Sequence, residues 1–203
     1  MSTTGKSTNA EAAPTRSEHL QGLMLAVTEA KRALDAAQMA FGPEPVADFT
    51  LTNPGGSAVK LSDLFGDSPD LLVAHNMGRG CNYCTLWADG FVGYTKHLAA
   101  RCPFVLCSND PPAVLSAFMA ERGWDFRCVS GIGPDGTNSG FANAMGFMSP
   151  AGKPWPGISG FHKDKAGQIA RTGSAPFGPG DDFCPVWPMF ELLKDGAGGF
   201  EPR

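Results

Sequence analysis

The segment Cys81-Asn82-Tyr83-Cys84 places two thiols three residues apart. If a helix begins here, both sulfurs lie on one face of its first turn, close enough to form a small-ring disulfide. The unpaired amides and the positive end of the helix dipole would lower the pKa of the first thiol below its usual value of about 8.5. The spacing therefore predicts Cys81 as an attacking thiolate and Cys84 as the thiol that resolves a mixed disulfide. Arg79, two residues earlier, could add positive charge if its side chain folds back towards the sulfur.

The surrounding residues predict a helix start at this point. The apolar run 71–74 suits a central strand buried on both faces, and a turn at 78–80 follows it. After the cysteines, apolar residues recur at helical spacing at Trp87, Phe91, Tyr94 and Leu98. A second buried strand at 104–107 leads through cap residues 108–110 into another helix, which begins at Pro111-Pro112. This alternation predicts right-handed βαβ connections and a sheet with a parallel portion.

The rest of the chain contributes shorter elements. Alternating apolar residues on both sides of the turn 53–56 predict a leading hairpin over 49–61. A short strand is expected at 126–129, and a hairpin at 157–164 and 168–172. A closing helix is expected at 185–194, with Asp181 and Asp182 as cap candidates. No internal repeat or obvious domain linker interrupts this order.

The N-terminal part differs from the rest in character. Residues 1–14 are small and polar and predict a disordered tail. Thr15 and Glu18 fit a capping box, and the helix that follows should run to about Phe41. The expected organisation is thus a tail at 1–14, a helical extension at 15–43 and an α/β domain at 44–197. The helix could pack on its own domain or on a second subunit, and a homodimer through it is one expected partnership.

Composition excludes several classes of protein. The 203 residues carry a formal net charge of −4 with 18% charged residues, so neither a nucleic-acid surface nor an anionic membrane patch is expected. The longest early apolar run, 23–27, is too short for an export signal or a membrane span, which makes the cytoplasm the expected location. Six cysteines are too few for a disulfide-stapled secreted module.

Metal binding and simple core packing are the competing interpretations of the cysteines. Cys81 and Cys84 with Cys102 and Cys107 faintly resemble a four-cysteine zinc ribbon. The spacing opposes it, because Cys102 and Cys107 should point to opposite faces of a strand, roughly 16 Å apart. No metal site is therefore expected. Two unrelated core cysteines are the second alternative, and an unused pair on an inherited scaffold is the third.

The order of elements resembles the thioredoxin-like superfamily, including its peroxiredoxin and thiol-disulfide reductase branches. The residues that carry the resemblance are the leading hairpin, 61–65, the buried strand and the CxxC-headed helix. His75-Asn76-Met77 before Gly80-Cys81, and the segment 87–91, are similar to a bacterial thioredoxin-like family of uncharacterised function. The resemblance spans about 16–196. It implies an α/β fold in which helices flank a central mixed sheet, with the N-terminal helix and leading hairpin as additions.

The resemblance also implies roles for individual residues. Pro156 matches the superfamily's cis-proline, which leaves neighbouring backbone free to pair with a substrate peptide, so substrate contacts are expected at Tyr83, Trp155, Pro156 and Gly157. His75 stands where thioredoxins have a buried carboxylate that assists proton transfer. An imidazole there could play that part, could stabilise a thiolate by carrying charge, or could be a strand histidine bonded to the backbone.

These features together predict a thiol-disulfide oxidoreductase without a cofactor beyond its own Cys81–Cys84 disulfide. Its partners would be a disulfide-containing protein or small thiol compound and an external reductant. A thiol-dependent peroxidase is an alternative, although Met77-Gly78-Arg79-Gly80 lacks the proline and threonine that peroxiredoxins place before their reactive cysteine. A non-catalytic thioredoxin-like binding module is another alternative.

Overall fold

The computed structural model describes residues 15–203 and divides the chain into two compact units, with the boundary between Phe41 and Gly42. The first unit contains helix α1, Arg16–Phe41. Its start is the predicted capping box: Thr15 N–H donates to the Glu18 carboxylate at 2.8 Å, and Glu18 N–H donates to Thr15 Oγ1 at 3.3 Å. The tail predicted at 1–14 lies outside the described residues.

The second unit is built on one mixed sheet with the strand order β1-β8-β7-β4-β5-β6-β2-β3. In chain order the strands are Glu44–Val46, Thr50–Thr52, Ala58–Lys60, Asp70–Asn76, Phe104–Ser108, Arg127–Ser130, Gly157–Lys163 and Ile169–Pro176. β4, β5 and β6 are parallel, whereas β7 runs antiparallel to β4 and β8 antiparallel to β7. The hairpin β2–β3 joins the sheet through a single pairing, Thr52 with Ser130.

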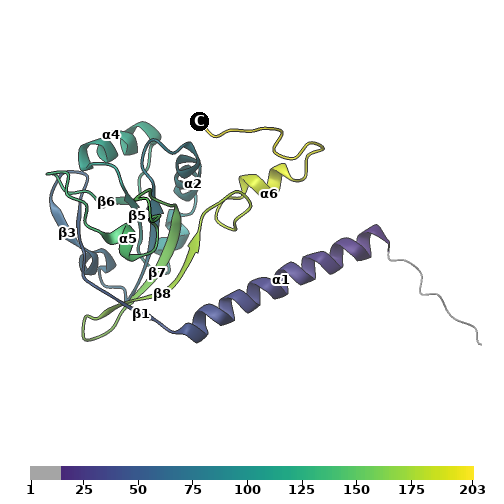
Figure 1. The fold of residues 1–203 in the computed structure, drawn as a ribbon, viewed down its shortest axis with the longest axis horizontal. Helices are drawn as coiled ribbons and strands as arrows, with labels where there is room; N and C mark the ends of the chain where they lie inside the picture. The colour runs from purple at the N-terminus through teal and green to yellow at the C-terminus, as the bar shows by residue number, and fades with distance from the viewer. Residues whose placement is uncertain (1–14) are drawn as a thin grey trace, which may run out of the picture. The chain divides into compact units, whose positions relative to one another are not determined.

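The connections make this a thioredoxin-like fold, as expected. After β4 the chain forms α2, Asn82–Val92, and α3, Thr95–Ala99, before it enters β5. Helix α4, Pro112–Arg122, connects β5 to β6. The two βαβ crossovers and the antiparallel pair β7–β8 all meet at the central strand β4 or next to it (Figure 1). The predicted fold class, with its leading hairpin and additional N-terminal helix, is therefore confirmed.

Each face of the sheet carries its own apolar core. One core joins Val73 of β4 to the leading hairpin, the 3-10 helix η1 at Leu61–Phe65 and the short helix α5 at Phe141–Ala144. The other joins Ala74 of β4 to α2, α4 and the final helix α6 at Val186–Phe190. Neighbouring residues of β4 thus point into different cores, as strand geometry requires.

Several elements differ from the sequence-based expectation. The helix expected to continue from the cysteines to Leu98 ends at Val92, because Gly93 forms its C-cap and α3 starts separately. Strand β1 and helix α5 were not predicted, since three- and four-residue segments give little periodicity. The closing helix is shorter than predicted, five residues instead of ten.

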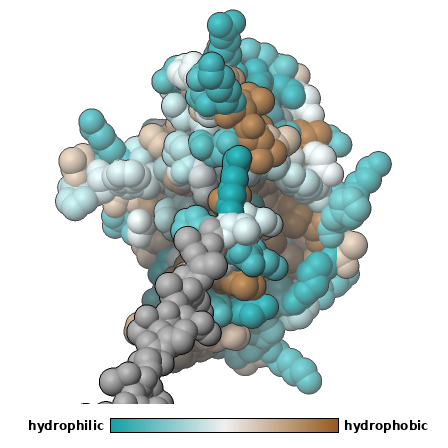
Figure 2. All heavy atoms as spheres, turned by 90° about the vertical axis from the view of Figure 1, so that its right-hand side faces the viewer, coloured by the Kyte–Doolittle hydropathy of each residue, from teal (hydrophilic) through white to brown (hydrophobic). Residues whose placement is uncertain are grey.

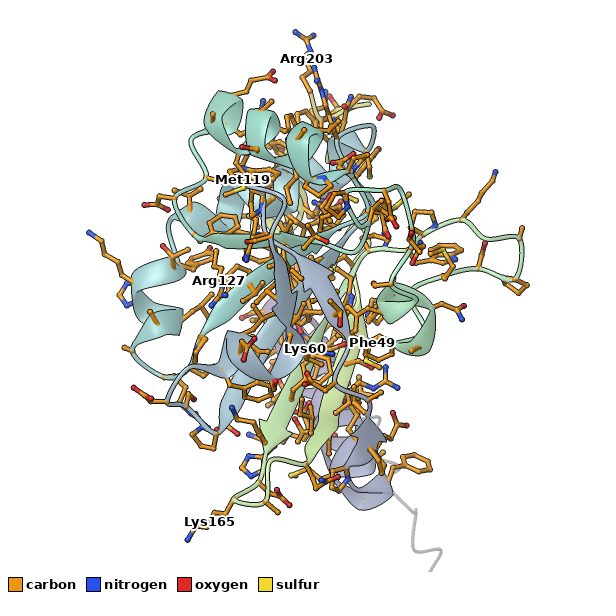
Figure 3. All side chains as sticks on the ribbon, turned by 90° about the vertical axis from the view of Figure 1, so that its left-hand side faces the viewer. Phe49, Lys60, Met119, Arg127, Lys165 and Arg203 are labelled. Carbon is orange, nitrogen blue, oxygen red and sulfur yellow. The ribbon has the colours of Figure 1, made fainter. Side chains whose placement is uncertain are left out.

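The ends of the second unit locate its C-terminal segment. Lys165, in the β7–β8 turn, lies at the opposite end from Arg203 (Figure 3). The C-terminus lies near α2 and α4 (Figure 1), where the first cysteine of the pair is found. On the face drawn in Figure 2, hydrophobic patches are interspersed with hydrophilic side chains. Within residues 15–203, no helix combines the length and hydropathy that a membrane span requires.

Candidate functional site

Cys81 is the N-cap residue of α2. It has an extended backbone conformation, and its Sγ accepts a hydrogen bond from the backbone N–H of Cys84 at 3.2 Å. Cys81 is partly exposed, whereas Cys84 is 2% exposed. Both thiols are free. The predicted arrangement at the helix start is therefore present, with the more accessible sulfur at the terminus.

The environments of the two sulfurs separate their pKa values. The hydrogen bond from the Cys84 side chain, together with those from the Cys84 and Tyr83 amides, lowers the pKa of Cys81 to about 6. The hydrogen bond to Cys81 and burial raise the pKa of Cys84. At neutral pH the pair therefore holds a thiolate at Cys81 and a protonated thiol at Cys84, which suits nucleophilic attack by the first.

Asn76, the last residue of β4, supports the turn that leads to the pair. Its Oδ1 accepts from Gly78 N–H at 2.7 Å, and its Nδ2 donates to the Cys84 carbonyl at 3.4 Å. Asn109, after β5, donates from its backbone N–H and its side chain to the Asn76 carbonyl, at 3.2 Å and 3.3 Å. The carboxyl ends of two parallel strands are thus joined beneath the first turn of α2.

Asp110 supports the same turn from the other side. Its Oδ2 accepts from Arg79 N–H at 2.7 Å and from Ser108 Oγ at 3.0 Å. Gly78 has φ of +110°, and a Cβ there would lie 2.7 Å from Asp110 Oδ1, so glycine is required. The expectation that Asp110 caps the following helix is wrong: Pro111 is the N-cap of α4 and has no side-chain cap bond. Polar residues at the ends of adjacent parallel strands were the sequence signal for this support, and it was read as helix capping alone.

His75 lies on the face of the sheet opposite to α2. Its ring stacks on Phe147 at 4.2 Å between centroids, and its Nε2 is 3.0 Å from Ser159 Oγ. Burial, with a smaller effect of Arg171, lowers the pKa of His75 to about 3, so the imidazole is neutral at ordinary pH. Two of its predicted roles lose support: it carries no charge for a thiolate, and its ring points away from the helix that holds Cys84. The third alternative, a strand histidine bonded within the core, agrees with its packing, although its partner is a hydroxyl.

The side chain of Arg79 is directed to α4. Its guanidinium lies 5.8 Å from the centre of the Phe118 ring and 3.9 Å from Glu121 Oε2. The side chain is more than half exposed. The structure therefore brings the backbone of Arg79, through Asp110, into the support of the site, but it directs the charge elsewhere.

Pro156 and Cys84 border the same small cavity, of about 10 Å³, together with Trp87 and Phe177. The proline predicted to oppose the cysteines is therefore close to the pair. The predicted cis peptide bond is wrong, because all peptide bonds of the described residues are trans. Trans is the intrinsically favoured isomer, and backbone hydrogen bonds hold the segment on both sides: Trp155 N–H donates to the Phe147 carbonyl, and Phe177 N–H to the Pro156 carbonyl.

Trp155 and Gly157 lie on either side of this proline. Trp155 is 59% exposed and borders an open hollow of about 560 Å³, whose other walls include Phe147, Met148 and Pro176. Gly157 is buried, and a Cβ there would lie 2.1 Å from the Phe147 ring and 2.6 Å from the Ala175 carbonyl oxygen. The structure thus places Trp155 where a substrate could reach it and gives Gly157 a packing role.

Tyr83, between the two cysteines, contacts the C-terminal segment. Its ring stacks on Trp187 with centroids 5.9 Å apart, and its hydroxyl donates to Glu201 Oε2 at 3.0 Å. This hydrogen bond raises the pKa of Tyr83. Sequence analysis did not identify Trp187 or Glu201 as neighbours of the pair, because contacts across more than 100 residues leave no local pattern.

The remaining cysteines are buried. Burial raises the pKa of Cys107 and of Cys128 to about 12, and the two lie in different cores. Cys184 packs among the residues around Trp87 and Trp187. Between residues 15 and 203, no group of three His, Cys, Asp or Glu side chains is arranged to hold a metal ion.

The fold and this site define a thioredoxin-like protein with a CxxC pair at the start of the first core helix. The chain belongs to the family described as "Bacterial protein of unknown function (DUF899)", whose model matches residues 13–199. No curated protein matches its sequence.

Solved structures with a similar fold include peroxidoxin BcpB from Mycobacterium tuberculosis, 26% identical over 63% of this chain and 80% of that one, with a TM-score of 0.49. A hypothetical protein from Sinorhizobium meliloti is 18% identical over 79% of this chain and 86% of that one, with a TM-score of 0.46. The bacterioferritin comigratory protein of Xanthomonas campestris is 17% identical over 66% and 87%, with a TM-score of 0.47. At these TM-scores the matches say nothing about the reaction.

Proposed function

We propose that the protein is a thiol-disulfide oxidoreductase, with Cys81 as nucleophile and Cys84 as resolving thiol. The observation that supports this most is the Cys81 sulfur at the N-cap of α2, where it accepts the Cys84 N–H and has a pKa of about 6. A thiolate that is present at neutral pH and partly exposed is the species that attacks disulfides.

The reaction balances with the two cysteines alone. Cys81 thiolate attacks one sulfur of the substrate disulfide, forms a mixed disulfide and releases the other sulfur as a thiolate. Cys84 then attacks Cys81 Sγ, loses its proton to the released thiolate, and frees the second substrate sulfur. The substrate gains two electrons, and the protein is left with a Cys81–Cys84 disulfide. An external dithiol reductant must restore the pair.

The surroundings of Pro156 favour substrate contact through side chains. The Trp155 N–H is already bonded to the Phe147 carbonyl, so an extended peptide would not find this donor free. The exposed Trp155 ring and its hollow remain available for the part of the substrate next to the disulfide. Tyr83 would border the other side of the thiolate.

A redox titration followed by mass spectrometry tests the proposal. The wild-type protein should form a reversible disulfide between Cys81 and Cys84, and Cys84→Ser should instead accumulate a mixed disulfide with the oxidant at Cys81. Cys102→Ser, which removes a thiol outside the pair, serves as the matched control and should behave as wild type. If both cysteines stay reduced at every potential, the proposal fails and a non-catalytic binding module takes its place.

A thiol peroxidase is the second candidate, because the same lowered pKa would serve attack on a hydroperoxide. Cys81 thiolate would take the terminal oxygen to give a sulfenic acid and an alkoxide, and Cys84 would condense with it to give the disulfide and water. Stoichiometric peroxide added to Cys84→Ser separates the two candidates. Rapid formation of a trapped sulfenic acid favours the peroxidase, and oxidation no faster than that of free cysteine favours the oxidoreductase.

A further inference from the structure

Helix α1 carries apolar side chains along one seam with a strict spacing of seven residues. The first position of each heptad holds Leu20, Val27, Leu34 and Phe41. The fourth position holds Leu23, Ala30 and Ala37. A repeat of 3.5 residues sustained in this way is typical of a two-helix coiled coil, whereas a helix that packs on a globular body presents a wider face at 3.6 residues per turn.

In a single chain this seam is exposed to water. None of the residues of α1 is buried, and the large seam side chains range from 47% exposed at Leu20 to 89% at Phe41. Most helical stability in proteins comes from packing of an apolar face, so a helix of this length with an open seam calls for a partner.

The size of the seam is sufficient for a dimer. The 26 residues of α1 extend over about 39 Å. If a helix of that length turns a side about 20 Å wide to a neighbour, it removes roughly 800 Å² from water. Stable interfaces bury about that area on each partner.

We propose that α1 pairs with α1 of a second copy of this chain in an antiparallel, two-fold symmetric coiled coil. In the register that places Val27 opposite the partner's Ala30, Leu20 lies opposite the partner's Ala37. Each of these layers therefore sets a large side chain against a small one, which fills the seam without overlap. A parallel pair would set Ala30 and Ala37 each against itself and leave gaps.

The same register also matches the ends of the two helices. Phe41 falls opposite the partner's Arg16, so each end of the coiled coil can place a guanidinium on an aromatic ring. The two-fold symmetry repeats this contact at both ends. The charged residues Glu29, Arg32 and Asp35 lie off the seam and show no excess of positive charge, which disfavours an anionic membrane as the partner.

Sedimentation equilibrium of the full chain in reducing buffer tests the proposal. The wild-type chain should be a dimer, and Val27→Asp should raise its dissociation constant at least tenfold. Leu25→Asp is the matched control: Leu25 is 59% exposed against 54% for Val27, but it lies off the seam. It should leave the dimer unchanged, and circular dichroism checks that both variants keep their helix.

The orientation has its own test. Val27→Lys and Ala30→Glu should each weaken the dimer, and the double variant should restore it, because in the antiparallel register each new lysine meets a glutamate of the partner. A parallel pair would place like charges together and stay weakened, which would refute the antiparallel arrangement.

A wild-type chain that stays monomeric at all concentrations would overturn the proposal, as would equal weakening by Leu25→Asp and Val27→Asp. Flotation with phosphatidylcholine–phosphatidylglycerol vesicles covers the membrane alternative. Vesicle binding by a monomeric wild-type chain that Val27→Asp abolishes would also overturn it. The proposal does not depend on the thiol chemistry, because α1 carries no cysteine.

Discussion

The backbone N–H of Cys84 points at Sγ of Cys81 across 3.2 Å. One residue thus supplies both an amide that stabilises the attacking thiolate and the thiol that is later oxidised with it. Because the amide belongs to the first turn of α2, its position follows from helix geometry and needs no separate support.

The pH dependence of Cys81 alkylation tests this relationship. Because thiolate is the reactive form and the pKa of Cys81 is about 6, the rate should rise with pH, reach half its plateau near that value and change little above pH 8. Iodoacetamide labelling followed by peptide mass spectrometry measures the rate at each cysteine separately. An apparent pKa at or above 8.5 for Cys81 would contradict the proposed role.

The side chain of Cys84 makes the largest contribution to this lowered pKa. Cys84→Ala removes that donor and leaves the two amides, so the apparent pKa of Cys81 should rise but remain below its ordinary value. Cys84→Ser keeps a donor and should fall between wild type and Cys84→Ala. Identical profiles for all three proteins would show that the side-chain hydrogen bond does not act on the thiolate.

Burial of neutral His75 should make the fold sensitive to acid. The pKa of His75 is about 3 in the folded protein and about 6.5 when unfolded, so the unfolded chain binds the proton more tightly. Stability is therefore complete above pH 6.5 and is lost as the pH falls towards 3, by up to roughly 4–5 kcal/mol at about 1.4 kcal/mol per pH unit. Urea titrations at pH 7 and 4.5 measure the loss.

His75→Gln should remove most of this pH dependence, and His97→Gln, on the exposed side of α3, should retain it. If both variants lose stability in acid as wild type does, other groups are responsible. The same variant also tests the position of the ring: because His75 lies away from α2, His75→Gln should reduce turnover at pH 7 less than tenfold.

Gly157→Ala should destabilise the protein by about 3 kcal/mol or more, because a Cβ would overlap a backbone carbonyl as well as the Phe147 ring. Gly90→Ala is the matched control within α2, where a Cβ meets open space. That substitution should stabilise by about 0.5–1 kcal/mol, since alanine favours the helix. Thermal or urea unfolding gives both values, and the opposite signs separate packing from a general effect of glycine replacement.

Removal of the Asp110 carboxylate should loosen the turn before Cys81. Asp110→Ala leaves Arg79 N–H without its acceptor and should cost about 2 kcal/mol, the usual size for a hydrogen bond to a charged group. Asp110→Asn keeps one acceptor oxygen and should cost less. Asp67→Ala, at an exposed position, should have little effect on the free energy of unfolding. Equal losses for Asp67→Ala and Asp110→Ala would rule out a specific support.

The elements around the pair were predictable because their signals are local. The apolar run before Gly78, the helical spacing after Cys84 and the capping box at Thr15 each lie within one turn or strand, and each formed as expected. The fate of Gly93 shows the limit: helical spacing continued to Leu98, but a glycine was enough to end the helix. Short segments such as β1 and α5 carry too few residues for any period to appear.

The side-chain directions around the site were not predictable in the same way. Arg79 reaches Glu121, Tyr83 reaches Glu201, and His75 stacks on Phe147, all through contacts that depend on how distant segments come together. The isomer of Pro156 likewise depends on the segments that hold it, and resemblance to a superfamily did not decide it.

The sequence by itself determined the thiol pair, the strand before it, the helix after it and therefore the lowered pKa of the first sulfur, since all of these follow from neighbouring residues. Only the tertiary structure decided which residues surround the pair: Asn76 and Asp110 beneath its turn, Pro156 beside it, and His75 on the opposite face of the sheet. The physical reason is one of range, because helix starts and strand periods are local properties, whereas the environment of a sulfur atom is set by segments that meet only when the chain has folded.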